Sequence, residues 1–505
     1  MPPNILLILT DQHRLSAVGA YGPTPCRTPN IDRLATEGVR FENVYTACPV
    51  CTPARASIIT GEAPHNHGLR ENVEDVGGPI NQLPDHPQLL SRRLGRAGYQ
   101  CGYVGKWHLG SDDRHRLDAP IQPSLPRDVG FEGDSFPGHG DGGWGYDEFH
   151  QYLRDRGLRC EYDEWPEAPA PFRESRAFRR MTTPVEATVP YYLTQNTIGL
   201  IDRFTDEKPG EPFFLWHNYW GPHEPYCPTA EYLDMYRDVS IEPWANFDWP
   251  ALETPGPHRF ALSPQVTKAG RNLPWESWEV GIRYYYAFTT MIDAQIGRMM
   301  EHLRQRGLLD NTVVIFAADH GEALGDHGGT YNKGFTHFEE THRIPLIVRM
   351  PDSTGAGTVD DRLVSLLDLY PTILDLAGEP PAGPRPQRPL DWPYHTAHHP
   401  DGESILPLIQ GRDVDWRDLV VSEFHGLLDN TAMMRTMRCG RYKYGFTYMG
   451  TDELYDLETD PHEMHNLIDD PAHAETADML LHRLLDWMEE RGDSYSHGLR
   501  MLRRI

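Results

Sequence analysis

Several short apolar runs along the chain end abruptly in polar residues. Residues 4–10 and 312–317 are apolar stretches of strand length, and they are followed by Asp11-Gln12 and, after one residue, by Asp319-His320. A short unbroken apolar run is typical of a strand that is buried on both faces of a sheet. Open α/β sheets bind ligands at the carboxyl ends of such strands. These two polar pairs are therefore candidate site residues.

Helical periodicity alternates with these runs. Apolar residues recur at helical spacing over residues 88–97, 190–204, 278–306 and 365–377, and a further helix is expected from Asn30, as its N-cap, to Gly38. Strands are also expected near 39–41, 100–104, 212–217 and 344–348. The alternation of helices and strands predicts an α/β domain.

Two long stretches show no period. Residues 111–185 and 227–275 are rich in Gly, Pro, charged and aromatic residues, a composition compatible with binding sugar or aryl groups. Because loops of this length are usually functional or disordered, we expect the first stretch to form a wall of the active site. The Pro-rich segment 379–393 is expected to be a surface crossover.

The pattern changes after about residue 400. Short strands are predicted over 418–424, 433–438 and 441–448, followed by an amphipathic helix over 471–490. We therefore predict a main domain over residues 1–400 and a smaller α+β domain of antiparallel strands plus one helix over residues 401–505.

Composition and charge narrow the class of protein. Of the 505 residues, 39% are hydrophobic and 24% are charged, as in ordinary globular proteins. The net charge of −27 argues against nucleic acid or an anionic membrane as a partner, so an anionic substrate would need a local positive pocket. The seven scattered cysteines do not suggest a disulfide framework. No leader-like segment precedes the first apolar run, so we expect a cytoplasmic protein.

Cys51 opens a distinctive segment, which reads Cys-Thr-Pro-Ala-Arg-Ala-Ser-Ile-Ile-Thr-Gly over residues 51–61. Pro53 and the following residues predict a helix that begins at or just after Cys51, where outward-facing N–H groups favour an anion. Arg55 adds a positive charge suited to an oxyanion. Cys51 is open to two other interpretations: a buried structural thiol, or a redox pair with Cys48 in C-x-x-C spacing.

Two sets of polar residues suggest a metal and an anion site. The first set consists of Asp11, Gln12, Asp319 and His320, whose oxygen and nitrogen donors favour Ca²⁺, Mg²⁺ or Mn²⁺, although an imidazole also suits zinc. The second set is basic and consists of Arg55, Lys106, His108, His223 and Lys333. Lysines are commonly solvated surface residues and histidines are often simply packed. However, Lys106, His108 and His223 lie in Gly- or Pro-flanked turns after predicted strands, where catalytic groups are often mounted.

The chain resembles the type I sulfatases of the alkaline phosphatase superfamily over nearly its whole length. The likeness rests on the segment 51–61 and on ordered matches elsewhere. These are Asn4-Ile-Leu-Leu-Ile-Leu-Thr-Asp-Gln12, Thr28-Pro-Asn-Ile-Asp-Arg-Leu34, Gly102-Tyr-Val-Gly-Lys-Trp-His-Leu-Gly110, Pro222-His-Glu-Pro225, Asp319-His-Gly-Glu322, Leu324-Gly-Asp-His-Gly328 with Lys333, and Leu454-Tyr-Asp-Leu457 with Asp460-Pro and Asn466-Leu. The resemblance implies a large mixed sheet sandwiched by helices.

The resemblance also implies an activity and a role for each site residue. In the family, a separate maturase oxidises the Cys to formylglycine, whose hydrate attacks a sulfate ester. The implied metal ligands are Asp11, Gln12, residue 51, Asp319 and His320, with Ca²⁺ expected first and Mn²⁺ or Mg²⁺ as alternatives. The implied catalytic residues are Cys51 as nucleophile, with Arg55 to orient it and Asp319 to accept its proton. Lys106, Lys333 and His223 are implied to bind the sulfate oxygens. His223, or alternatively Lys333, is the implied acid for the leaving alcohol, and His108 is the base that releases sulfate.

This sequence departs from many relatives at two metal positions. It has Gln12 where many have Asp, and His320 where many have Asn, and both changes reduce negative charge at the metal. The expected substrate is an aryl or carbohydrate sulfate monoester, with no nucleic acid or membrane partner, and a homo-oligomer is compatible with the sequence. The alternative is a phosphonate monoester or phosphodiester hydrolase with the same site. Lys106 and His108 favour sulfate, because that sister group tends to lack the segment that carries them.

Overall fold

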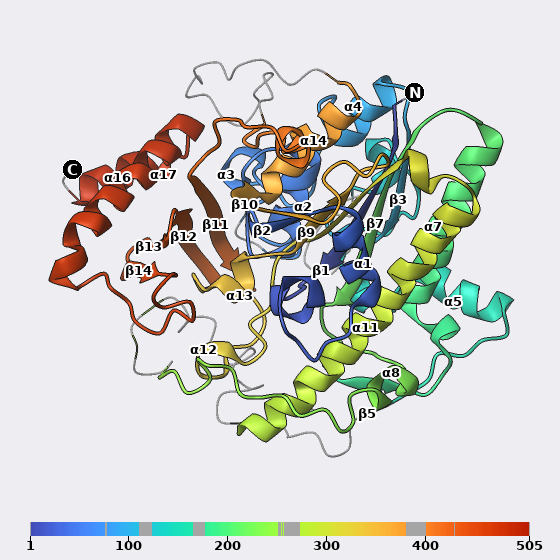
Figure 1. The fold of residues 1–505 in the computed structure, drawn as a ribbon, viewed down its shortest axis with the longest axis horizontal. Helices are drawn as coiled ribbons and strands as arrows, with labels where there is room; N and C mark the ends of the chain where they lie inside the picture. The colour runs from blue at the N-terminus through green and yellow to red at the C-terminus, as the bar shows by residue number, and fades with distance from the viewer. Residues whose placement is uncertain are drawn as a thin grey trace, which may run out of the picture.

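An eight-stranded mixed sheet forms the centre of the computed structural model, which describes residues 2–75, 78–110, 124–164, 177–250, 254, 256, 273–379, 400–428 and 430–503 (Figure 1). Its strand order is β10-β2-β9-β8-β1-β7-β3-β4. Strand β9 is antiparallel to both of its neighbours, and the other pairs are parallel. The strands are β1 (Asn4–Asp11), β2 (Val39–Tyr45), β3 (Gln100–Gly105), β4 (Glu132–Gly133), β7 (Phe213–Pro222), β8 (Thr312–Ala318), β9 (Leu346–Arg349) and β10 (Thr358–Ser365).

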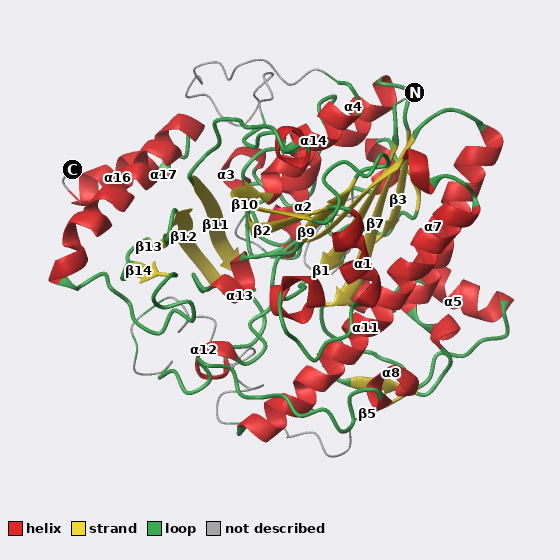
Figure 2. Ribbon diagram, in the orientation of Figure 1, coloured by secondary structure: helices red, strands yellow, loops and turns green. Residues whose placement is uncertain are grey.

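Helices cover both faces of this sheet (Figure 2). Successive side chains of a strand point to opposite faces. On β1, Leu6 and Ile8 accordingly join one hydrophobic core, whereas Leu7 and Leu9 join the other. The first core is covered by α1 (Pro29–Glu37), α7 (Val189–Glu207) and α11 (Trp275–Gln305), and the second by α2 (Cys51–Thr60), α4 (Leu90–Arg96) and α14 (Leu369–Leu376). The predicted α/β architecture is confirmed.

A second, antiparallel sheet follows in the order β11-β12-β13-β14. Its strands are β11 (Leu419–Leu427), β12 (Asn430–Cys439), β13 (Tyr442–Thr447) and β14 (Glu453–Asp456). Helices α16 (Ala474–Arg491) and α17 (Tyr495–Arg503) come last, and α16 packs on this sheet around Met437, Leu454 and Leu484. The sequence predicted the sheet and one helix but missed β14 and α17. The boundary at residues 400/401 stays a prediction.

The two stretches without a period contain regular elements that the sequence did not predict. Besides β4, these include α5 (Asp147–Asp155), the hairpin of β5 (Tyr162–Glu164) and β6 (Arg179–Met181), and α8 (Ala230–Asp234). Helix α5 packs its Phe149 and Tyr152 rings against Tyr192 of α7. Residues 111–123, 165–176 and 380–399, which include most of the Pro-rich segment, and most of 251–272 lie outside the described residues. The remaining short helices are α3 (Pro64–His67), α12 (Asp326–Gly329), α13 (Glu339–His342) and α15 (Leu406–Ile409).

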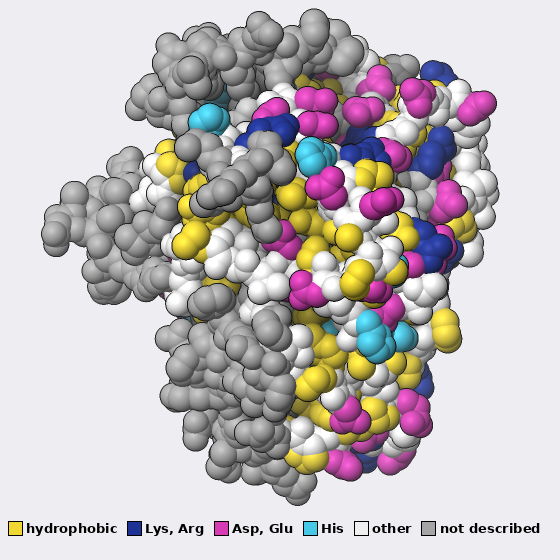
Figure 3. Space-filling view, turned by 90° about the vertical axis from the view of Figure 1, so that its left-hand side faces the viewer, with side chains coloured by type: hydrophobic (Ala, Val, Ile, Leu, Met, Phe, Trp, Pro, Cys, Tyr) yellow, Lys and Arg dark blue, Asp and Glu magenta, His cyan; other side chains and the backbone are white. Residues whose placement is uncertain are grey.

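The surface is mixed in charge. On the face in Figure 3, Asp and Glu side chains are spread over the described surface, with Lys and Arg among them. Among the described residues, no helix has both the length and the hydropathy that crossing a bilayer requires.

Candidate active site

Four neighbouring strands end at the same edge of the sheet, and each delivers site residues there. Strand β1 pairs with β7 and with β8, and β7 pairs with β3, all in parallel. Parallel strands present their carboxyl ends together. Asp11 and Gln12 therefore lie beside Asp319 and His320, with Lys106 and His108 following β3 and His223 following β7.

The backbone at this edge requires unusual conformations. A Cβ added at Gly105, which has φ 92°, would lie 1.8 Å from the carbonyl oxygen of Asn218, so only glycine fits before Lys106. Gln12 and His108 have φ of 58° and 56°, in the left-handed region that non-glycine residues rarely adopt. Such strain is concentrated at functional sites.

Cys51 is the first residue of α2, as the sequence predicted, and it is completely buried. Its Sγ lies 3.3 Å from Nε2 of His320, 3.6 Å from Oδ1 of Asp11 and 2.9 Å from Nζ of Lys333. Burial alone would raise the pKa of the thiol, but Lys106, Lys333 and His320 outweigh it and hold the pKa well below its usual value. Position 51 is therefore built to carry a negative group.

Arg55 connects the two carboxylates behind Cys51. Its Nε donates to Oδ2 of Asp319 at 3.0 Å, and its Nη2 lies 3.6 Å from Oδ2 of Asp11. Its Nη1 donates to the carbonyl of Lys106 and to Oδ1 of Asn218. The guanidinium is fully buried, so it holds the carboxylates of the two candidate metal ligands Asp11 and Asp319 in fixed positions.

Asp11, Cys51, Asp319 and His320 each present one ligand atom, and these atoms all lie within 4.8 Å of one another. Nδ1 of His320 lies 3.0 Å from the carbonyl of Gly321. Because a carbonyl only accepts, Nδ1 carries a proton, and a neutral ring then leaves the Nε2 lone pair for a ligand role. Two carboxylates and an imidazole fit a divalent cation.

Gln12 joins this group through a partner that the sequence analysis missed. Its Oε1 accepts from Nζ of Lys333 at 2.8 Å, and its Nε2 donates to the buried carboxyl of Glu322. Glu322 also accepts from the backbone N–H groups of Leu324 and Asn332. The sequence analysis placed Glu322 in the matched segment Asp319-His-Gly-Glu322 but assigned it no role.

Lys106 and His108 line the other side of Cys51. Lys106 forms a buried ion pair with Asp11, and Nε2 of His108 lies 2.8 Å from Oε2 of Glu74. Burial would lower the pKa of His108, but Glu74 outweighs it and raises the pKa. Glu74 was not predicted, because it lies in an irregular segment without a pattern.

Nearby charges also set the state of Asp11. Burial and the Cys51 thiolate would raise the pKa of this carboxyl, but Lys106, His223 and Arg55 lower it to about 2. Three buried cations, Arg55, Lys106 and Lys333, thus face two carboxylates, Asp11 and Asp319. Buried cations therefore balance the buried anionic groups of the site within a strongly acidic protein.

His223 follows β7, and its backbone N–H donates to the backbone carbonyl of Asp11 at 3.0 Å. Its Nδ1 lies 2.6 Å from the carbonyl of Glu224, which only accepts, so Nδ1 is the donor in this pair. A third histidine, His139, packs between the two predicted ones. Its ring centroid lies 4.9 Å from that of His223 and 5.4 Å from that of His108.

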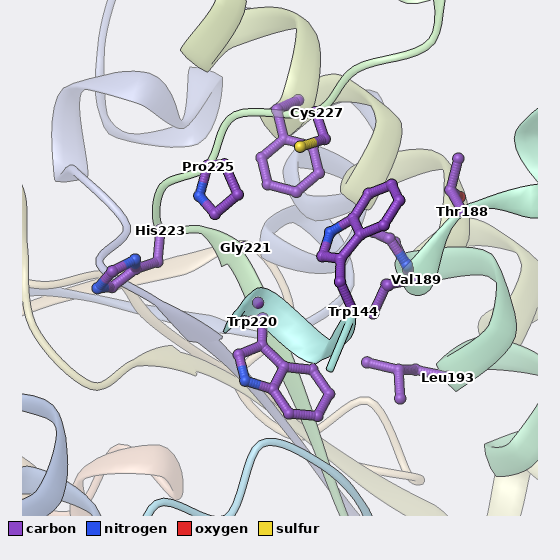
Figure 4. A pocket seen from close by; sticks show the side chains of 12 residues that line it. Trp144, Thr188, Val189, Leu193, Trp220, Gly221, His223, Pro225 and Cys227 are labelled. Carbon is purple, nitrogen blue, oxygen red and sulfur yellow. The ribbon is translucent and has the colours of Figure 1, made fainter. Parts of the chain in front are cut away.

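An apolar pocket lies next to His223. Figure 4 shows the His223 ring turned away from its walls, which include Trp144, Leu193 and Trp220. Its cavity volume is about 20 Å³, which is room for about one water molecule. It is too small for a sugar or an aryl ring.

The loop that carries Lys333 rests on the C-terminal sheet. The Phe335 ring packs at 4.8 Å on Phe424 of β11. Nδ1 of His337 pairs with Thr436 at 2.7 Å, and its Nε2 pairs with Thr447 at 3.0 Å. The second sheet therefore fixes the position of one site residue without supplying any.

Comparison with known proteins identifies the family. The sulfatase family model matches residues 3–379, and the model of the C-terminal part of N-sulphoglucosamine sulphohydrolase matches residues 325–490. The chain belongs to the sulfatase family. This sulfatase is 30% identical to the uncharacterized sulfatase YidJ of Escherichia coli, over 99% of this chain and 91% of that protein. It is 29% identical to an arylsulfatase of Clostridium perfringens, over 100% of this chain and 98% of that protein.

Solved structures agree on the fold. A phosphonate monoester hydrolase of Agrobacterium radiobacter superposes with a TM-score of 0.74 at 24% identity, covering 97% of this chain and 96% of that one. The family model and the sulfatase relatives show that the protein is a sulfuric ester hydrolase, and the solved structure shows an alkaline phosphatase-like fold. The non-catalytic and redox interpretations of Cys48 and Cys51 are not supported. Both thiols are free, and Cys48 lies in an apolar cluster with Val50 and Phe335, where burial holds the pKa of its thiol well above the usual value.

Proposed function

We propose that this sulfatase hydrolyses an aryl or carbohydrate sulfate monoester to the alcohol and inorganic sulfate, with a formylglycine derived from Cys51 as the nucleophile. The observation that carries the proposal is the position of Cys51 Sγ, which lies within 3.6 Å of Asp11, His320 and Lys333. In the proposal, this sulfur marks where the oxygens of the formylglycine hydrate lie.

The donor set fits a divalent cation, with Ca²⁺ expected first and Mn²⁺ or Mg²⁺ as alternatives. Asp11, Gln12, Asp319, His320 and residue 51 would hold it. When bound, the cation lowers the pKa of a hydroxyl at residue 51 and so supplies a nucleophile at neutral pH.

The chain's own residues bind the ester and move its protons. Lys106 and Lys333 offset the charge of the sulfate oxygens as the ester bond breaks. Asp319 accepts a proton from the attacking hydroxyl while Arg55 holds that carboxylate in place. His223 gives its Nε2 proton to the oxygen of the leaving alcohol. His108 then takes a proton from the remaining hydroxyl at residue 51, which lets sulfate leave.

The competing proposal is hydrolysis of phosphonate monoesters or phosphodiesters by the same residues. The solved phosphonate monoester hydrolase shares the fold. The ion pair of Lys106 with Asp11 and the pairing of His108 with Glu74 place two further basic groups beside residue 51. These groups favour the sulfate monoester as the main substrate.

Two measurements test the proposal. Intact-protein mass spectrometry should show residue 51 lighter than Cys when the chain is co-expressed with a formylglycine-generating maturase, and unmodified without it. Cys51→Ala should abolish turnover of sulfated sugars and aryl sulfates while the melting temperature is retained. An unmodified enzyme with full activity would contradict the nucleophile assignment. A phosphonate monoester in the same assay separates the two candidate functions.

A further inference from the structure

His139 belongs to the catalytic pocket, although no motif marks it. It lies in a Gly-rich segment of the first insertion, outside the sheet edge that supplies the other site residues. Its ring is tilted by 57° against the ring of His223 and by 70° against that of His108. It therefore forms the wall between the group that protonates the alcohol and the group that releases sulfate.

One nitrogen of His139 is left without a partner. Nε2 is shielded from solvent and makes no hydrogen bond to any residue that the structure describes. A buried polar atom in this state is destabilising, because it has lost its hydrogen bonds to water without gaining others. Unpaired groups of this kind call for an explanation, and a ligand that completes the pairing is one.

The surroundings of His139 indicate which ligand completes it. Burial and the nearby Lys106, His223 and His108 all lower the pKa of His139, well below the usual value. The ring is therefore neutral, and a neutral imidazole offers an N–H donor without a further positive charge. Oxygen atoms of a sulfate ester are acceptors only, so they match this donor.

The apolar pocket beside His223 is not the place where the sulfate ester binds. It lies beside the His223 backbone, away from the side to which the His223 ring points, and holds about 20 Å³. This pocket is too small for the ester, so the proposal places the ester and its alcohol on the polar side of His223, where His139 packs.

We infer that His139 is a substrate-binding residue of this sulfatase, donating a hydrogen bond from Nε2–H to an oxygen of the bound sulfate ester. This inference rests on the proposed function. His139 adds a neutral donor to Lys106 and Lys333, and it holds the ester between His108 and His223 without changing the net charge of the pocket.

Three variants separate the hydrogen bond from the packing. His139→Phe keeps a ring against His223 but removes both nitrogens, whereas His139→Gln loses the ring but keeps an N–H donor. We expect kcat/KM for a sulfate ester to fall roughly 10- to 100-fold in His139→Phe, as for a lost hydrogen bond to a charged ligand. His139→Gln should recover a large part of that loss. His150→Ala, at an exposed histidine of the same insertion, is the matched control.

Binding of inorganic sulfate, measured as competitive inhibition, should weaken in His139→Phe by a similar factor, with bound metal and melting temperature unchanged. Wild-type kcat/KM and wild-type sulfate inhibition in His139→Phe would overturn the inference. Equal losses in the Phe and Gln variants would assign His139 a packing role and also overturn it. Cys51→Ala tests the proposed function separately. If Cys51→Ala is inactive but His139→Phe behaves like the wild type, the proposed function stands and only the inference about His139 is wrong.

Discussion

Nζ of Lys333 lies 2.9 Å from Sγ of Cys51, although 282 residues separate the two in sequence. The same ammonium group donates to Oε1 of Gln12 at 2.8 Å, and it is buried. Cys51 and Asp11 raise its pKa against the lowering effect of burial. Lys333 is therefore a fixed positive charge beside residue 51, where the proposed function places the breaking ester bond.

Replacing Lys333 should remove transition-state stabilisation. We expect Lys333→Met to lower kcat/KM for a sulfate ester by about 10²- to 10³-fold, in the range seen when one charge-stabilising donor is lost. Lys208→Met changes an exposed lysine that pairs only with Glu211 among the described residues, and it serves as the control. A Lys333→Met enzyme with activity close to that of the control would show that this ammonium group does not act on the substrate.

Lys106 and His108 should decide between the two candidate substrate classes. We expect Lys106→Ala and His108→Ala each to reduce sulfate ester hydrolysis steeply. In the proposed function, Lys106 offsets the charge of the sulfate oxygens and His108 is the base that releases the product. Both variants should be assayed on an aryl sulfate and on a phosphonate monoester. If only the phosphonate activity falls, the alternative function is favoured.

Removal of the metal should affect both activity and stability. The carboxylates Asp11 and Asp319 are buried beside each other, and a ligand that binds only the native state stabilises it. Treatment with a chelator should abolish turnover and lower the melting temperature, and Ca²⁺, Mn²⁺ or Mg²⁺ should restore both. Elemental analysis measures the bound metal, and Asp319→Asn should no longer respond to its addition. Full activity in metal-free protein would refute the metal site.

Asp134 should make the stability of the protein depend on pH. Burial raises its pKa to about 7, although hydrogen bonds from Asn196 and the N–H of Gly105 oppose the shift. Between the usual value of 3.8 and about 7, the native state holds a proton that the unfolded state has lost. The protonated Asp134 therefore contributes its full stabilisation below pH 3.8, and this contribution decreases as the pH rises to about 7.

Asp134→Asn should remove this slope. The expected change is about 2 kcal/mol in the difference between the free energies of unfolding at about pH 5 and about pH 7. Urea denaturation at the two pH values measures it, with Asp85→Asn at an exposed carboxylate as the control. An unchanged slope would mean that Asp134 ionises normally in the folded protein.

Much of the fold followed from the sequence because its central strands are buried on both faces. Unbroken apolar runs marked β1 and β8, and the polar residues after them, Asp11 and Asp319, meet at one edge of the sheet. Cys51 was placed at a helix start for a similarly local reason, since Pro53 fits the first turn of α2.

Features that depend on distant partners were not predictable. The sequence made Asn30 the N-cap of α1, but Thr28 precedes the helix. The N–H groups of Asn30 and Ile31 instead donate to Asp293, a buried carboxylate of α11. The roles of Glu74, His139 and Glu322 likewise depend on residues brought close only by folding. The helix α5 was missed because its few apolar residues lie in a segment dominated by Gly, Pro and charged residues.

The support of the Lys333 loop by the C-terminal sheet has a consequence for protein engineering. Phe424, Thr436 and Thr447 carry no chemistry, yet they hold Phe335 and His337, which flank the lysine closely in sequence. Replacing the C-terminal sheet with that of a relative would thus lower the turnover rate unless these contacts were kept in the replacement. In directed evolution, substitutions at the contact between the Lys333 loop and the C-terminal sheet should accordingly change the turnover rate rather than the solubility.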